Sequence, residues 1–184
     1  AIPAILGKRD ILGIAKTGSG KTASYVLPIL MNSLKGAALK NRHIKVLVLV
    51  PTRELAVQVQ EVFQSFASAL SERVKTMAVY GGVSINPQMM ALQGVNILIA
   101  TPGRLLELVE SKAVHLSSID TLVLDEADKM LNLGFKEEMN RIFGLLPEKR
   151  QNLLFSATLS DNVKNIHQVL LHDPLVIQIK SETD

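Results

Sequence analysis

The sequence predicts an α/β fold: an open, doubly wound, mostly parallel sheet with helices on both faces. Short β-branched runs recur along the chain, and each is followed by a turn and then a helical pattern. Most of these runs are continuously apolar rather than alternating, as expected for strands buried on both faces. Because 47% of the residues are hydrophobic and only 4% are aromatic, aliphatic side chains must form most of the core.

The alternation places the elements in order along the chain. The strands are expected at 11–15, 46–50, 76–79, 97–100, 121–124, 152–155 and 176–179, and the helices at 21–34, 53–70, 86–93, 103–110, 135–145 and 162–171. Ser160 is expected to cap the last helix, because its hydroxyl can accept a hydrogen bond from the first turn. Since an ordinary domain has roughly 150 residues, the 184 residues are expected to form one domain, 1–184.

Composition narrows the class of protein. A net charge of +3 permits binding to a polyanion without establishing it. The absence of cysteine excludes disulfides and thiolate chemistry. Apolar runs such as 46–50 are far shorter than the roughly 20 residues of a membrane helix. We therefore expect a cytoplasmic protein with no membrane segment.

The unusual residues gather where ligands of open α/β sheets bind, beyond the carboxyl ends of the strands. They fall in the segments 16–20, 51–53, 81–82, 101–104, 125–128 and 156–158. The opposite edge is expected to carry ordinary polar loops, among them the basic stretches 35–45 and 147–150. A site on the carboxyl edge is therefore predicted from topology alone.

A glycine-rich turn follows the first expected strand and opens the first long helix. It has the pattern of a phosphate-binding P-loop, except for Ala15, where the general pattern has glycine. Lys21 would reach the β- and γ-phosphates, and the Thr22 hydroxyl would ligate Mg²⁺. A glycine turn that only caps a helix is the alternative. The phosphate-binding candidates are Lys16, Thr17, Gly18, Ser19, Gly20, Lys21 and Thr22.

An acidic run follows the apolar residues 122–124. Asp125, at the end of a buried strand, is placed to hold Mg²⁺, most simply through water because this ion gives up its hydration reluctantly. Glu126 could orient and deprotonate an attacking water. The alternative is that these acids simply favour a helix N-terminus. The catalytic candidates are Lys21, Asp125 and Glu126, and the metal candidates are Thr22 and Asp125.

Taken together, these segments resemble the motifs of the DEAD-box RNA helicases, in the family's order along the whole chain. The chain is similar to the first of their two RecA-like domains. The matching segments are Ala15-Lys16-Thr17-Gly18-Ser19-Gly20-Lys21-Thr22, Pro51-Thr52-Arg53-Glu54-Leu55-Ala56, Gly81-Gly82, Thr101-Pro102-Gly103-Arg104, Asp125-Glu126-Ala127-Asp128 and Ser156-Ala157-Thr158.

The resemblance implies an ATPase that uses ATP and Mg²⁺ to remodel or locally unwind RNA. Asp128, Ser156 and Thr158 would couple the nucleotide state to domain closure. Arginines and free N–H groups at helix starts can grip the RNA backbone without reading its sequence. The RNA-facing candidates are Pro51, Thr52, Arg53, Gly82, Thr101, Gly103 and Arg104.

Two features of the family are missing from the chain: the glutamine that reads adenine, upstream of Ile2, and the second RecA-like domain. We expect this chain to be a monomer with a weakened preference for adenine. It should also be nearly inactive alone, because an arginine finger from the second domain is worth roughly 10³–10⁵ in rate in comparable hydrolases.

Two other functions are compatible with parts of the pattern. One is a nucleotide-gated RNA clamp or assembly platform, in which hydrolysis only resets binding. The other is a P-loop kinase acting on a small acceptor, which would need a basic lid and an acceptor pocket. Neither feature is evident in the sequence, and the acid beside Asp125 favours water as the nucleophile.

Overall fold

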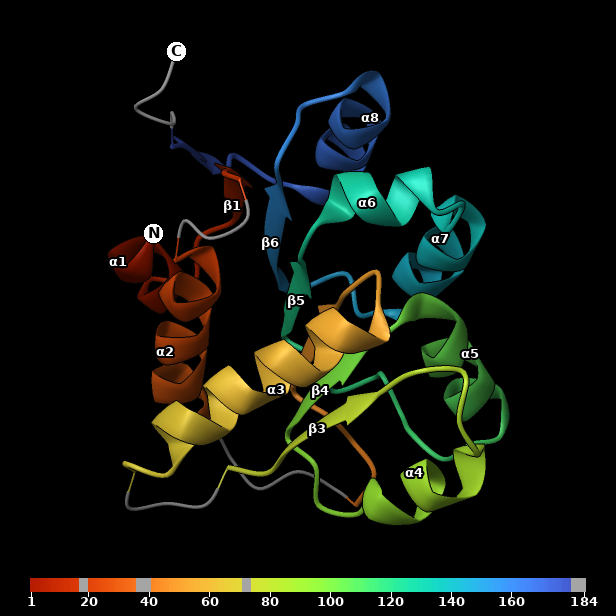
Figure 1. Ribbon diagram of the computed structural model, residues 1–184. Coiled ribbons are helices and arrows are strands. Elements are labelled where there is room, and N and C mark those ends of the chain that lie inside the picture. Colours follow the sequence, from red (N-terminus) through yellow and green to blue (C-terminus); the bar gives the residue numbers. More distant parts are fainter. Residues whose placement is uncertain (17–19, 36–40, 71–73, 180–184) are drawn as a thin grey trace.

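The computed structural model describes residues 1–16, 20–35, 41–70 and 74–179. Its centre is a parallel sheet with the strand order β3-β4-β2-β5-β6-β1-β7 (Figure 1). The strands are β1 (Ile11–Ile14), β2 (Val46–Leu49), β3 (Thr76–Val79), β4 (Ile97–Ala100), β5 (Thr121–Leu124), β6 (Gln151–Ser156) and β7 (Leu175–Gln178). The predicted fold class is confirmed, and every strand pairing is parallel.

Helices cover both faces of the sheet. They are α1 (Ile2–Leu6), α2 (Lys21–Ser33), α3 (Arg53–Ala67), α4 (Ile85–Ala91), α5 (Pro102–Glu110), α6 (Ala127–Asn132), α7 (Lys136–Leu145) and α8 (Asp161–Leu170). All six expected helices are present with ends shifted by one to three residues, and Ser160 caps α8 by accepting a hydrogen bond from the Val163 N–H (3.4 Å). The two short helices α1 and α6 were not expected.

Two apolar layers hold the helices to the sheet. Alternate residues of a strand face opposite sides, so Val46 and Val48 join one layer while Leu47 and Leu49 join the other. The first layer packs against α1, α2 and α3 and contains the buried ring of Phe63. The second packs against α5, α6, α7 and α8 (Figure 1). This two-sided burial explains the continuously apolar strand sequences.

Because all the strands are parallel, the loops that follow them emerge at one edge of the sheet. The loops after β1, β5 and β6 are neighbours there, since these strands lie in the order β5-β6-β1. In the same way, the loops after β2, β4 and β3 lie side by side further along the edge. The fold therefore creates two adjacent regions on the carboxyl edge, one around the start of α2 and one around the starts of α3 and α5.

Candidate nucleotide and RNA site

The start of α2 and the end of β5 bring together a buried ion pair. Gly20 adopts a left-handed conformation (φ 76°) that aims the chain into α2, and Lys21 is the first residue of the helix. Asp125 follows the last residue of β5. The Lys21 Nζ lies 3.1 Å from Asp125 Oδ1, with the two side chains only 7% and 0% exposed. The predicted convergence of the glycine turn and the acidic run is therefore present.

The pair carries unused bonding capacity. Although Lys21 Nζ and Asp125 Oδ1 are within ion-pair distance, neither atom makes a hydrogen bond of good geometry within the described part of the chain. Buried polar atoms of this kind are rare, because an unmet donor or acceptor costs about 1–3 kcal/mol. An ammonium and a carboxylate that pair with each other and keep further hydrogen-bonding capacity fit a magnesium–phosphate group.

Tyr25 contributes to the site and was not anticipated from the sequence. It lies one turn after Lys21 on α2, is fully buried, and its hydroxyl donates a 2.8 Å hydrogen bond to Asp125 Oδ2. Burial, reinforced by the charge of Asp125, raises the pKa of Tyr25 well above its usual 10.0. The hydroxyl therefore remains a donor that fixes the orientation of the carboxylate. Its spacing of four residues from Lys21 was the only sequence signal.

The remaining acidic residues begin α6. Glu126 precedes this helix in a left-handed conformation (φ 54°) and is half-buried. Asp128, in the first turn, accepts a 3.2 Å hydrogen bond from the Thr158 hydroxyl through Oδ2, and the Ser156 hydroxyl donates to the Thr158 carbonyl at 2.8 Å. The three residues expected to couple nucleotide state to domain movement are thus linked, joining the end of β6 to α6.

Other parts of the predicted phosphate loop are only partly described. Thr22 is half-buried in the first turn of α2, and Lys16 is exposed. Thr17, Gly18 and Ser19 lie outside the described residues. The Ser24 hydroxyl donates to the Lys21 carbonyl at 2.5 Å, which stabilises the turn that presents Lys21.

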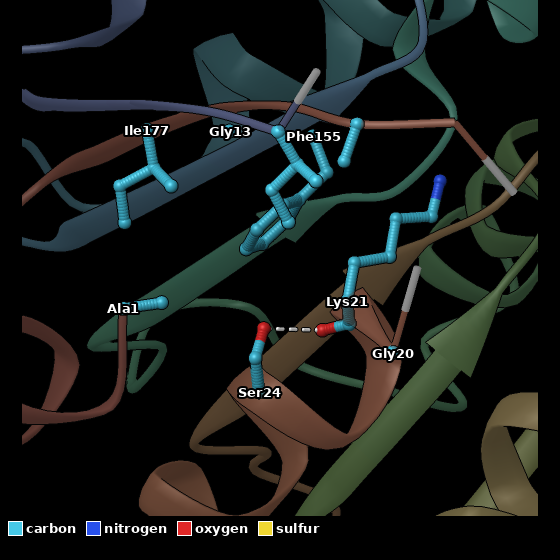
Figure 2. Close-up of a pocket in the computed structure, with 9 residues that line it drawn as sticks. Ala1, Gly13, Gly20, Lys21, Ser24, Phe155 and Ile177 are labelled. Atoms are coloured by element: carbon cyan, nitrogen blue, oxygen red, sulfur yellow. Dashed lines mark hydrogen bonds between the residues drawn. The ribbon is translucent and has the colours of Figure 1, made fainter. Parts of the chain in front are cut away.

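An apolar cavity of about 180 Å³ lies beside the start of α2. Figure 2 shows Phe155 and Ile177, from the sheet, and Lys21 and Ser24, from the first turn of α2, among its lining residues. The Phe155 ring lies against Gly13, where an added Cβ would be 2.6 Å from Phe155 Cδ1. Glycine at this position of β1 is therefore required for the ring to form the cavity wall.

The second region of the edge holds the candidates for RNA contact. Thr52 caps α3 by accepting from the Leu55 N–H at 3.2 Å. Arg53 is exposed, and its guanidinium carbon lies 4.9 Å above the centre of the Tyr80 ring, a cation–π contact. Gly82 is exposed with φ 80°, and an added Cβ there would meet open space, so the backbone can be approached closely.

Arg104 differs from its neighbours because it is only 7% exposed and all three of its guanidinium nitrogens already donate a hydrogen bond. Its guanidinium donates to Glu107 Oε2 (2.8 Å), Gln88 Oε1 (2.8 Å) and the Val83 carbonyl (2.9 Å). Gln88 in turn donates to the Tyr80 carbonyl at 3.2 Å. Arg104 and Gln88 therefore brace both sides of the Gly81–Gly82 turn, and Gln88 had no signal in the sequence.

The remaining candidates surround this network. Thr101 and Pro102 are buried where β4 passes into α5, Gly103 is half-buried in the first turn, and Pro51 is buried ahead of α3. The structure thus brings Pro51, Thr52, Arg53, Gly82, Thr101 and Gly103 to one stretch of the edge. Arg104 follows Gly103 in the first turn of α5, but at 7% exposure little of its side chain is open to contact with RNA.

The doubly wound sheet and the convergence of a glycine turn with a strand-end carboxylate define a P-loop domain. Residues 1–166 match the model of the DEAD/DEAH box helicase family, and the chain belongs to this family.

Curated relatives and a solved structure agree with this assignment. The chain is 46% identical over 182 residues to the DEAD-box ATP-dependent RNA helicase CshA of Streptococcus pneumoniae, covering 98% of this chain and 34% of the relative. It is 42% identical to the DEAD-box ATP-dependent RNA helicase RhpA of Helicobacter pylori, over 97% of this chain and 35% of that protein. The crystal structure of a DEAD box protein from the hyperthermophile Methanococcus jannaschii superposes with a TM-score of 0.87 at 35% identity, covering 97% of this chain and 48% of that one.

The chain thus spans about a third of the length of these curated relatives. Within the described residues, no helix is long and apolar enough to cross a membrane.

Proposed function

We propose that this chain is the ATP-binding and RNA-backbone-binding domain of an ATP-dependent RNA helicase, which hydrolyses ATP to remodel or locally unwind RNA when joined to a second RecA-like domain. The observation that carries the proposal is the buried Lys21–Asp125 pair, at 3.1 Å and with an unmet hydrogen-bonding atom on each side. The names of the relatives favour remodelling over a passive RNA clamp.

In this proposal each residue at the start of α2 and the end of β5 has one task. Lys21 and the N–H groups of residues 16–22 bind the phosphates, since a helix N-terminus and an ammonium both stabilise negative charge. Thr22 and Asp125 would hold Mg²⁺, which supplies charge neutralisation to the phosphates when bound. Tyr25 holds the Asp125 carboxylate in place through its 2.8 Å hydrogen bond.

Glu126 is the proposed general base, because it follows Asp125 directly and its left-handed backbone turns the chain out of the sheet into α6. It would orient the attacking water and accept its proton. The Asp128–Thr158 and Ser156–Thr158 contacts would transmit the loss of the terminal phosphate to the partner domain.

RNA would lie along the region around the starts of α3 and α5. Arg53 is the exposed cation there, and the turn at Gly82 together with the free N–H groups after Pro51 and Thr101 supplies backbone donors. Such contacts are to phosphate and sugar and carry no sequence information. We place Arg104 behind this surface, where it shapes the turn. We further propose that the chain is a cytoplasmic monomer.

The test compares the chain alone with the chain extended by a second RecA-like domain. RNA should stimulate ATP hydrolysis by the two-domain protein, while the chain alone should be slower by roughly 10³–10⁵ if the missing domain supplies an arginine finger. Glu126→Gln should lower kcat by roughly 10²–10⁴ with little change in nucleotide affinity. Brisk RNA-stimulated turnover by the chain alone, or an unaffected Glu126→Gln variant, would contradict the proposal.

A further inference from the structure

The amino edge of the sheet, opposite the nucleotide site, carries a row of charged side chains. Lys45, Asp120 and Arg150 each stand directly before a strand, namely β2, β5 and β6, which are neighbours in the sheet. Backbone hydrogen bonds fix the relative positions of these residues. The Asp120 N–H donates to the Lys45 carbonyl (2.9 Å), and the Gln151 N–H donates to the Asp120 carbonyl (2.8 Å). Successive members are therefore one strand spacing apart, about 4.8 Å.

A recess of about 480 Å³ opens along this row. It is lined by Lys8, Asp120, Lys149, Arg150 and Gln151, and we call it the amino-edge recess. Lys8 comes from the turn between α1 and β1, the next strand after β6. The segments at the starts of three neighbouring strands, β5, β6 and β1, thus deliver polar or charged groups to one hollow, where we expected only solvated loops from the sequence.

The Arg150 guanidinium is oriented by hydrogen bonds to two neutral acceptors. Its Nε donates to Asn152 Oδ1 at 2.9 Å and its Nη1 to the Pro147 carbonyl at 2.7 Å. Both acceptors are neutral, so the guanidinium is oriented without being neutralised by its contacts. Partial burial lowers the pKa of Arg150, and the charge of nearby Asp10 opposes that shift. A fixed, partly desolvated guanidinium binds phosphate more strongly than a mobile one.

Among the residues that line the recess, three cations stand against one carboxylate, that of Asp120. Lys8 and Lys149 are exposed, and Lys45 Nζ lies 3.8 Å from Asp120 Oδ2, which is a loose ion pair. Asp120 is 41% exposed and accepts from the Thr121 hydroxyl through Oδ1 (2.9 Å). The other nearby acids are Glu148, on the loop before β6, and Asp10, which is buried and accepts hydrogen bonds from the Asn152 and His172 N–H groups.

We propose that the amino-edge recess binds phosphate groups of an RNA strand that runs across this edge, away from the nucleotide site. The cations at Lys8, Lys149 and Arg150 match phosphates, and Asp120, at the β5 end of the recess, matches a hydroxyl donor. RNA carries a 2′-hydroxyl beside every phosphate, whereas an acidic peptide would place only further negative charge against Asp120. The proposal rests on the RNA engagement proposed above and adds a second contact for the same ligand.

Binding can be measured with a uridine 20-mer by fluorescence anisotropy over a range of salt concentrations. In the Lys8→Gln/Lys149→Gln variant, affinity should fall roughly tenfold, since each contact of an exposed lysine with a phosphate is worth about threefold. The slope of log K against log salt should shrink by about 1.4, which is 0.7 for each of two lost phosphate contacts on a single strand. The matched control is Lys136→Gln/Lys164→Gln, which removes two exposed lysines outside the recess.

Two further measurements separate the possible ligands. Asp120→Ala should reduce the preference for the uridine 20-mer over a deoxyuridine 20-mer by about threefold or more, because it removes the acceptor for the 2′-hydroxyl. In NMR titrations with the RNA 20-mer, the amides of Thr121 and Gln151 should shift. The amides beside Arg53 and Gly82 report separately on RNA binding at the carboxyl edge. A failure of RNA binding in the amino-edge recess is therefore distinguishable from a failure at the carboxyl edge.

The proposal is overturned if the recess variant binds RNA as the control does, or if the Thr121 and Gln151 amides respond to inorganic pyrophosphate but not to RNA. It is also overturned if polyglutamate competes for these amides more strongly than RNA does. An unchanged RNA-to-DNA ratio in Asp120→Ala would remove the assigned role of that carboxylate.

Discussion

Replacing both members of the Lys21–Asp125 pair should destabilise the nucleotide-free protein by far less than the sum of the two single replacements. The side chains are 7% and 0% exposed and 3.1 Å apart, so either single change leaves a buried polar or charged group without its partner. Breaking a buried ion pair from one side costs about 3–5 kcal/mol. The suitable substitutions are Lys21→Met, which keeps the length of the side chain, and Asp125→Asn, which keeps its shape.

The structure places the two single losses at or just below the lower limit of that range. In Lys21→Met the Asp125 carboxylate keeps the Tyr25 hydroxyl as a donor, so the loss should be close to the lower limit, about 3 kcal/mol. In Asp125→Asn the Lys21 ammonium is left beside a neutral amide, and we expect a loss of about 2–3 kcal/mol. The double variant contains neither charge and should lose only about 2–3 kcal/mol in total, which gives a coupling energy of about 3 kcal/mol.

The free energy of unfolding can be measured by urea denaturation of all four proteins without nucleotide, with the m-value as a check that the transition remains the same. Exposed pairs couple by less than about 1 kcal/mol. If the effects of the two substitutions add within about 0.5 kcal/mol, the two groups do not interact in the folded protein, and the reasoning that joins the glycine turn to the acidic run is refuted.

Three other substitutions test the surroundings of the two sites. Because the pKa of Tyr25 is raised above its unfolded value, its protonated hydroxyl stabilises the fold below pH 10, and this contribution is lost as the pH rises further. Above pH 10 the unfolding free energy of the wild type should therefore fall more steeply than that of Tyr25→Phe, by up to about 1.4 kcal/mol per pH unit. Parallel curves for the two proteins would contradict the raised pKa of Tyr25. Gly13→Ala should cost about 1–3 kcal/mol in urea denaturation, because the new Cβ would lie 2.6 Å from Phe155 Cδ1; a variant as stable as the wild type would mean that the ring moves freely. Gln88→Leu removes the acceptor of one Arg104 N–H and should lower the free energy of unfolding by about 1–3 kcal/mol. It should also weaken RNA binding severalfold in fluorescence anisotropy. Unchanged RNA affinity would show that RNA binding does not depend on these contacts around the Gly81–Gly82 turn.

The sheet and the convergence of Lys21 with Asp125 at the candidate nucleotide site were predictable because both follow from local patterns. Apolar runs of four or five residues mark strands buried on both faces, and the rule that ligands bind beyond their carboxyl ends then places the site. The convergence of Lys21 with Asp125 required only that β1 and β5 lie near each other in one parallel sheet. Helix ends were predicted less accurately: for example, Pro102 and Asp161 begin their helices one residue earlier than expected.

The features that could not be predicted from the sequence are very short helices and contacts between distant segments. The helix α1 has five residues and α6 has six, too short to show a helical period. The Tyr25–Asp125 hydrogen bond joins residues 100 positions apart. Likewise, Arg104 was predicted to be an exposed phosphate ligand, yet it is buried and donates hydrogen bonds to Gln88 of α4 and to the Val83 carbonyl after β3.

The most direct test of the nucleotide site is isothermal titration calorimetry of ATP binding with and without Mg²⁺, in the wild type, Lys21→Met and Asp125→Asn. In the proposed function Lys21 acts on the phosphates and Asp125 on the ion, so the two substitutions should have different signatures. Lys21→Met should weaken binding under both conditions, while Asp125→Asn should abolish most of the enhancement by Mg²⁺ and leave metal-free binding nearly unchanged. If Asp125→Asn retained the full enhancement, Asp125 would not serve the magnesium–nucleotide site, and the central claim would be wrong.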